Sequence, residues 1–368
     1  MLLNKNTYNQ YSYLLKYLGA FLFGCLVLVY VSSILRAPTN QLRQKSGDLH
    51  FLINEAESTQ KRMIAIISAM DDNYIVIDPG IKGADTINQL LSTRWNGDPS
   101  YITDFSRAAI IVNNFFEVYR CLDNIGKSLE IVNVSDNFFS PYPEGYRDVN
   151  IVFKDPVNNH LGEIQINTKA NQDYKNKRGY KIFDSMRTIK AKAHLEKREL
   201  TSQEREEIDN LILESSIGYN QSLGDSMKVG DKFLRVGVYG ILIRDNQVLM
   251  VRTQSGSRSI YNFPGGGVDH GEGLAQALLR ECKEEIGADV IIQDRVYTAK
   301  ELYINEDFPD SYMFNLYYKI KLKENESING VDAKWFPVSS LPIDEMLSID
   351  KEFASEILQG NSKLMPIT

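Results

Sequence analysis

The sequence predicts a chain of mixed α/β and α+β class, in which an N-terminal transmembrane helix precedes two folded domains. Three observations predict this class. An uncharged apolar run of nineteen residues, 17–35, lies near the start of the chain. Strand-like and helix-like segments alternate over residues 108–134, as in a sheet covered by helices. Near the C-terminus, three consecutive glycines at 265–267 precede an amphipathic helix that carries several glutamates.

Length and composition indicate the kind of protein. With 368 residues and 43% hydrophobic content, the chain is long enough for two ordinary domains. A net charge of −7 argues against a broad basic surface, so we expect no DNA partner. The three cysteines, at positions 25, 121 and 282, are too few for a disulfide framework and fit a reducing compartment.

Residues 1–36 predict a single-pass membrane anchor. As a helix, the nineteen residues 17–35 would span about 28 Å, which is near the thickness of a bilayer core. A cleaved signal peptide is the alternative, because "VSS" at 31–33 could serve as a small-residue cleavage site. Basic residues flank the run on both sides, and those that follow it lean toward a cytoplasmic body. We therefore expect a membrane protein whose catalytic body lies in the cytoplasm.

Three further regions follow the anchor. Residues 37–74 predict a helical linker, because they read as helix between the apolar run and the first strand. Residues 75–228 predict an α/β domain with a mixed sheet, and a polar helical stretch at 196–216 comes near its end. Residues 229–368 predict the last domain.

The middle domain alternates strands and helices. We expect a strand at 108–113, a helix at 114–129 and a second strand at 129–134. Two more strands flank the turn-rich "DPVNNH" at 155–160, which predicts a hairpin. This alternation favours a sheet with helices packed on it.

Glu281, Glu284 and Glu285 predict a metal site. On a helix, side chains at these positions fall within a sector of about 100°. Like charges at this spacing repel unless a cation lies between them, and oxygen ligands suit Mg²⁺ or Mn²⁺. A solvated charged face is the alternative. The glycines at 265–267 favour the metal site, because a backbone without β-carbons can approach a metal or a phosphate closely.

These residues resemble the Nudix box, G-x5-E-x7-R-E-U-x-E-E-x-G-U, in which U is a bulky aliphatic residue. Cys282 and Ala288 stand at the two U positions. The resemblance covers roughly residues 231–360 and implies an α/β/α sandwich. Seven fixed positions match: Gly266, Glu272, Arg280, Glu281, Glu284, Glu285 and Gly287.

The resemblance implies hydrolysis of a nucleoside diphosphate linked to another group, with nucleotides as substrates. It implies that Glu281, Glu284 and Glu285 are catalytic and bind Mg²⁺ or Mn²⁺, with the Gly265 carbonyl as a further ligand. It also implies that Glu272 and Arg280 brace the loop and the helix.

Arg252, in "LMVRTQSGSR", is a candidate phosphate-binding residue in the same domain. A cation at the end of a strand suits a phosphate group. A solvated arginine at the end of a strand is the alternative.

Four segments of the middle domain resemble the synthetase domain of the RelA/SpoT family, whose members move pyrophosphate from ATP to a nucleotide 3′-hydroxyl. "EIQINTK" carries Glu163 and Gln165 of the family's Glu-x-Gln strand. "GYRDVN" places Tyr146 where an aromatic stacks on the acceptor base. "DPSYITDFSRAAIIVN" places Asp104 at the Mg²⁺ carboxylate, and "IKGADTI" keeps Lys82 of the ATP-binding segment.

This second resemblance implies a catalytic role for Glu163, as the base that takes the proton of the acceptor hydroxyl. It implies that Asp104 binds Mg²⁺, and that Lys82, Tyr146 and Gln165 bind nucleotides. ATP and a guanine nucleotide are the implied partners, with synthesis of the guanosine tetraphosphate type. A tRNA partner stays open.

The leading hypothesis is a membrane-anchored fusion of a RelA/SpoT-like pyrophosphokinase domain with a Nudix hydrolase. Two departures favour an alternative for the middle domain: Gly80 and Asn150 stand where the family has an adenine-stacking Arg and a His. In that alternative the domain is catalytically silent and senses a nucleotide or RNA to regulate the Nudix domain. A scaffold without activity would need a broken Nudix box, and this box is intact.

Overall fold

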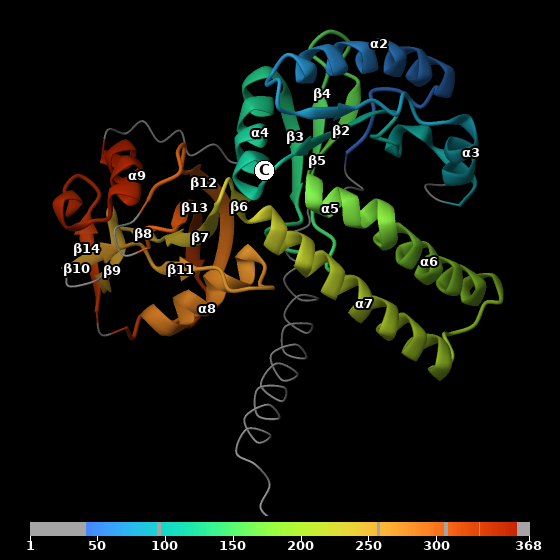
Figure 1. Ribbon diagram of the computed structural model, residues 1–368. Coiled ribbons are helices and arrows are strands. Elements are labelled where there is room, and N and C mark those ends of the chain that lie inside the picture. The colour runs from blue at the N-terminus through green and yellow to red at the C-terminus, as the bar shows by residue number, and fades with distance from the viewer. Residues whose placement is uncertain (1–41, 94–96, 256–257, 305–307, 331, 359–368) are drawn as a thin grey trace, which may run out of the picture.

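The computed structural model of the chain describes residues 42–93, 97–255, 258–304, 308–330 and 332–358. The predicted anchor, residues 1–36, lies outside these ranges. Within them, no helix combines the length and the apolar composition that a bilayer crossing needs. Figure 1 shows two lobes, an N-terminal one mainly in blue to green and a C-terminal one in yellow to red.

The N-terminal lobe, which we call the middle domain, is built on one five-stranded sheet. β2 and β5 are parallel, and the other neighbouring pairs are antiparallel. The predicted hairpin is confirmed, since β4 pairs with β5 across the turn at 155–160. The strands in spatial order are β1 (Ile75–Ile77), β2 (Ser106–Val112), β5 (Leu161–Thr168), β4 (Val149–Lys154) and β3 (Glu130–Asp136).

Helix α2 (Leu49–Ser68) packs on this sheet. Its stripe of buried side chains includes Leu52 and Met63, and the Gln60 amide both donates to and accepts from the backbone of Arg107 in β2, at 2.8 Å each. The sequence predicted a linker over residues 37–74. Within the described part of that range, helix α2 packs its apolar stripe on the sheet of the middle domain.

A helical hairpin projects from the middle domain (Figure 1). One arm is α5 (Lys169–Tyr174), a π-helical turn over 175–179 and α6 (Tyr180–Leu195), and the other is α7 (Ser202–Ser226). The predicted helix at 196–216 begins at Ser202, because Thr201 and Glu204 form a capping box. A β-carbon at Gly218 would lie 2.0 Å from the Tyr174 ring, so a glycine is needed where the arms meet.

The C-terminal domain contains two sheets that pack with α8 (Leu274–Ile286) and α9 (Ser348–Leu358). One sheet has the order β11 (Gly265–Gly267), β7 (Lys232–Ile241), β13 (Ser311–Leu322) and β12 (Val290–Thr298), with β6 (Lys228–Val229) on β7. The other has the order β10 (Arg258–Asn262), β9 (Gln247–Ser255) and β14 (Ala333–Pro337), with β8 (Ile243–Arg244) on β9.

The two domains share one hydrophobic core. Helix α4 (Phe115–Ser128) lies between the middle-domain sheet and the C-terminal domain (Figure 1), and Phe115 and Phe116 meet the Phe314 ring edge-on. The buried Arg295 of β12 pairs with Asp123 of α4 at 3.2 Å. One continuous cluster of buried apolar side chains contains residues of both domains. The shared core therefore fixes the position of each domain relative to the other.

Candidate active sites

Helix α8 carries the three predicted metal-binding carboxylates. The predicted amphipathic helix is confirmed, because one of its faces is apolar and buried, with Leu274, Leu278, Cys282 and Ile286. The helix ends at Gly287, whose φ of 68° lies in the left-handed region that glycine adopts without strain. The glutamates thus lie on a rigid element anchored by its apolar face.

The glycine strand β11 lies directly against these carboxylates. The backbone N–H of Gly265 donates to Glu285 Oε2 at 2.9 Å. A β-carbon at Gly266 would lie 2.7 Å from the carboxylate of Glu281. A side chain at position 266 would push the end of Glu281 aside, so glycine lets the backbone reach the acidic patch as the sequence indicated.

Arg280 braces the loop 267–272, which precedes α8, as the Nudix resemblance implied. Its guanidinium donates to both oxygens of Glu272, at 2.9 and 3.0 Å, and to Glu281 Oε1 at 2.7 Å. It also donates to the carbonyl of Gly267 at 3.1 Å. Arg280 therefore links the loop before α8 to the first of the three carboxylates.

Burial makes this patch receptive to a cation. Burial, together with the charges of Glu281 and Glu284, raises the pKa of Glu285 to about 7, although the hydrogen bond from the N–H of Gly265 lowers it. A divalent cation would stabilise the charged form of such a carboxylate, and an all-oxygen donor set fits Mg²⁺ or Mn²⁺. In the part of the chain that the structure describes, no three acidic, histidine or cysteine side chains already converge on one metal position.

Residues 233–357 match the family model of the NUDIX domain. An RNA pyrophosphohydrolase from Nitratiruptor sp. is 32% identical over 116 residues, which are 28% of this chain and 72% of that protein. This chain belongs to the NUDIX family.

Two other similarities differ in extent. An RNA pyrophosphohydrolase from Campylobacter jejuni is 30% identical to this chain over 90 residues. These residues are 22% of this chain and 56% of that protein. The chain thus spans about half the length of these curated relatives. The solved complex of the type VI effector Tas1 and its immunity protein aligns at 18% identity, over 47% of this chain and 95% of that chain. Its TM-score of 0.37 is too low to indicate a shared fold.

Arg252 of the NUDIX domain lies in β9, opposite Tyr261 of β10. Its Nε donates to the Ser259 hydroxyl at 2.7 Å, and its guanidinium lies 5.6 Å from the centroid of the Tyr261 ring. Within the described residues these contacts hold Arg252 to the β10 strand, and none joins it to α8. The predicted phosphate contact therefore stays a prediction.

Outside the NUDIX domain, the structure brings four predicted residues of the middle domain together. Lys82 Nζ lies 2.5 Å from Asp104 Oδ2, and Lys82 is buried. The amide of Gln165 donates to Glu163 Oε1 at 3.2 Å in β5. Of the charged groups that shift the pKa of Glu163, Asp104 has the largest effect, which links the two pairs into one cluster at the sheet.

Tyr146 lies at the edge of this cluster. Its hydroxyl donates to Asp148 Oδ2 at 2.9 Å and accepts from Lys175 Nζ at 3.1 Å. The Lys175 ammonium lies 5.0 Å from the centroid of the ring, and Tyr219 meets the ring edge-on. Sequence reasoning missed Asp148 and Lys175. Asp148 stands in the quoted "GYRDVN", but nothing in the spacing of the sequence indicates Lys175.

The electrostatics of this cluster favour proton uptake at Glu163. Burial raises the pKa of this carboxyl, and the negative charges of Asp104 and Asp148 raise it further. A hydrogen bond from Asn150 and the charge of Lys82 act in the opposite direction. A carboxylate whose pKa is raised in this way is better suited to accept a proton than a solvated one.

Proposed function

We propose that the NUDIX domain hydrolyses a pyrophosphate bond in a nucleoside diphosphate derivative or an RNA end, with Mg²⁺ or Mn²⁺ held by Glu281, Glu284 and Glu285. The half-buried Glu285, which lies beside two further carboxylates and accepts a hydrogen bond from the glycine strand, is the observation that carries the proposal. The names of the two RNA pyrophosphohydrolases support an RNA end as one substrate. The Gly265 carbonyl is a further proposed ligand.

The residues of the NUDIX site have different roles in the proposed hydrolysis. When bound, divalent metal neutralises the pyrophosphate and lowers the pKa of a coordinated water. Glu281 takes part in deprotonating the attacking water. Gly266 keeps the space beside Glu281 open, because it has no side chain. Arg280 and Glu272 hold the loop in place, since their ion pair has both of its bonds within 3.0 Å.

A substrate panel tests this proposal. The purified full chain is incubated with triphosphorylated RNA, dinucleotides and nucleotide sugars, with Mg²⁺ or with EDTA, and products are identified by mass spectrometry. We expect at least one class to be cleaved at its pyrophosphate bond, and only with metal. Cleavage of no class, or equal cleavage in EDTA, would contradict the proposal.

A second candidate function concerns the middle domain. We propose that it transfers pyrophosphate from ATP to the 3′-hydroxyl of a guanine nucleotide, with AMP as the leaving product. The convergence of Lys82, Asp104, Glu163 and Gln165 favours this function. Glu163 takes the proton of the acceptor hydroxyl, Asp104 holds Mg²⁺, Lys82 and Gln165 bind nucleotide, and Tyr146 stacks on the acceptor base.

The sensor hypothesis is the alternative for this domain, and one pair of variants separates the two. In a Glu285→Gln background, which prevents consumption of the product, Glu163→Gln should abolish transfer yet keep nucleotide binding. Glu207→Gln, at an exposed position of α7, is the matched control. If the background forms no product but nucleotide binds and changes hydrolysis by the chain with Glu285 intact, the sensor hypothesis replaces transfer. If no nucleotide binds, the RelA/SpoT resemblance of the middle domain indicates its fold but not its function.

A further inference from the structure

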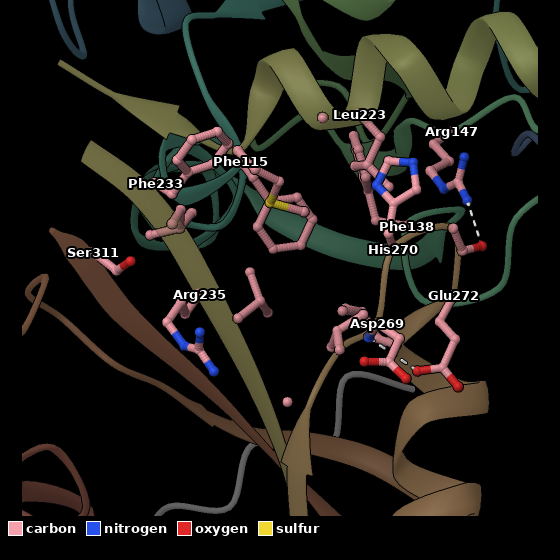
Figure 2. A pocket seen from close by; sticks show the side chains of 18 residues that line it. Phe115, Phe138, Arg147, Leu223, Phe233, Arg235, Asp269, His270, Glu272 and Ser311 are labelled. Atoms are coloured by element: carbon pink, nitrogen blue, oxygen red, sulfur yellow. Dashed lines mark hydrogen bonds between the residues drawn. The ribbon is translucent and has the colours of Figure 1, made fainter. Parts of the chain in front are cut away.

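A cavity of about 540 Å³ lies between the two domains (Figure 2). Its walls come from the start of β7, from the NUDIX loop 267–272, from the end of α7 and from the middle domain. Phe115, Phe138 and Leu223 give it an apolar side. None of the proposed metal-binding residues lines this cavity, and its volume is in the range of ordinary small-molecule sites.

Arg147 of the middle domain lines the cavity and is only 4% exposed. Its guanidinium donates to the carbonyls of Gly145 and Gly271, at 2.9 and 3.5 Å. Among the described residues no carboxylate forms an ion pair with it, and burial alone lowers its pKa to about 10. A buried cation without an anion is costly, so this position favours an anionic ligand.

The other nitrogen-bearing side chains of the wall add to this preference. Figure 2 shows His270 near Arg147 and Arg235 across the cavity from them. The guanidinium of Arg235 lies 4.0 Å from the centroid of the Phe308 ring, and no described carboxylate pairs with it. Of the two acidic residues on the wall, Glu272 is neutralised by Arg280. The other, Asp269, is 79% exposed and lies 3.8 Å from the same guanidinium.

We propose that the cavity binds a nucleoside phosphate, with its phosphate beside Arg147 and its nucleoside toward the apolar side of the cavity. A phosphate supplies the anion that Arg147 lacks, and an apolar wall suits the less polar nucleoside part of the ligand. This binding does not depend on the proposed hydrolysis, whereas its effect on turnover does.

The position of Arg147 also couples the ligand to the NUDIX site. Arg147 contacts the carbonyl of Gly271, and the next residue, Glu272, holds Arg280. Arg280 in turn donates to Glu281. A phosphate that draws Arg147 toward itself weakens its long bond to Gly271. The ligand therefore changes how the loop 267–272 is held, and with it the rate of hydrolysis.

Calorimetric titrations of the full chain in EDTA test the binding, with AMP, GDP and orthophosphate as probes. Arg147→Met keeps the volume and removes the buried charge, so we expect it to fold and to bind the nucleotide at least about tenfold more weakly. Lys82→Ala removes a cation of the middle-domain site, and Arg178→Met removes an exposed arginine paired with Glu214. Arg178→Met should bind as the unchanged chain does, and Lys82→Ala should keep the binding that Arg147→Met weakens. If Arg147→Met does not fold, Arg235→Gln is used in its place.

Three outcomes would overturn the proposal. The first is nucleotide binding that Lys82→Ala abolishes and Arg147→Met leaves unchanged, because the ligand then lies in the middle domain. The second is no nucleotide binding to the unchanged chain. The third concerns coupling: saturating nucleotide should change NUDIX turnover by on the order of fivefold or more, and an unchanged rate would contradict the coupling.

Discussion

The backbone N–H of Ala275 donates to the backbone carbonyl of Phe139 at 3.0 Å. The first turn of α8, the helix that carries the NUDIX carboxylates, is therefore hydrogen-bonded to the middle domain. The first turn of a helix has N–H groups without partners inside the helix, and here the middle domain supplies one. Leu274 makes a similar, longer bond to the carbonyl of Phe138, at 3.4 Å. The two domains are thus joined at the start of the catalytic helix.

This junction predicts a cost for a methyl group at Gly273. A β-carbon there would lie 2.7 Å from the Pro141 ring and 3.0 Å from the Phe139 carbonyl. We expect Gly273→Ala to lower the free energy of unfolding by about 1 to 3 kcal/mol, as overpacking does. Gly83→Ala, which meets no atom within 4 Å, is the control. Urea denaturation measures both, and equal stability of the two variants would contradict the junction.

A second pair of glycines separates the chemistry of the NUDIX site from its fold. Gly266→Ala places a methyl group 2.7 Å from the Glu281 carboxylate, whereas Gly267→Ala meets open space. We expect Gly266→Ala to lower kcat by on the order of 10²-fold, because it displaces a group that stabilises charge at the reacting centre. Gly267→Ala should retain nearly full activity. Steady-state kinetics would contradict this account if both variants behaved alike.

Asp350 predicts how stability depends on pH. Burial raises its pKa to about 6, although hydrogen bonds from Tyr317 and Asn315 act against that rise. Because the folded-state pKa lies above the ordinary value, the folded state favours the protonated form. The protonated Asp350 carboxyl therefore contributes fully to stability below about pH 4. This contribution is lost as the pH rises through 6.

Asp350→Asn should therefore raise the free energy of unfolding at pH 7 by up to about 3 kcal/mol, and leave it nearly unchanged near pH 4. Asp344→Asn, at an exposed position, should change neither value. Chemical denaturation at the two pH values measures the difference. A gain in stability that is the same at both pH values would show that Asp350 does not titrate as described.

The uncharged run at 17–35 predicts membrane attachment from sequence alone, and it lies outside the described residues. We expect the full-length chain in the membrane fraction, resistant to extraction by high salt and released by detergent. Recovery in the soluble fraction, or a mature N-terminus near Ile34, would contradict an uncleaved anchor.

Sequence patterns predicted what depends on neighbours along the chain. The α8 glutamates and their buried stripe lie within one helix, so helical periodicity places them. The β4–β5 hairpin follows from one turn. Contacts between distant residues were not predictable in this way. Arg147 and Gly271 are 124 positions apart, and Lys175 reaches Tyr146 only because the helical hairpin folds back on the sheet.

The requirement for metal at Glu285 tests the central claim most directly. With a substrate identified from the panel, initial rates of hydrolysis are measured over a range of Mg²⁺ concentrations for the unchanged chain, Glu285→Gln and Glu324→Gln. Glu324 is exposed and serves as the matched control. We predict that Glu285→Gln lowers the rate at saturating Mg²⁺ by on the order of 10²-fold or more, while Glu324→Gln leaves it unchanged. An unchanged rate and Mg²⁺ dependence in Glu285→Gln would contradict the claim that these carboxylates form the metal site.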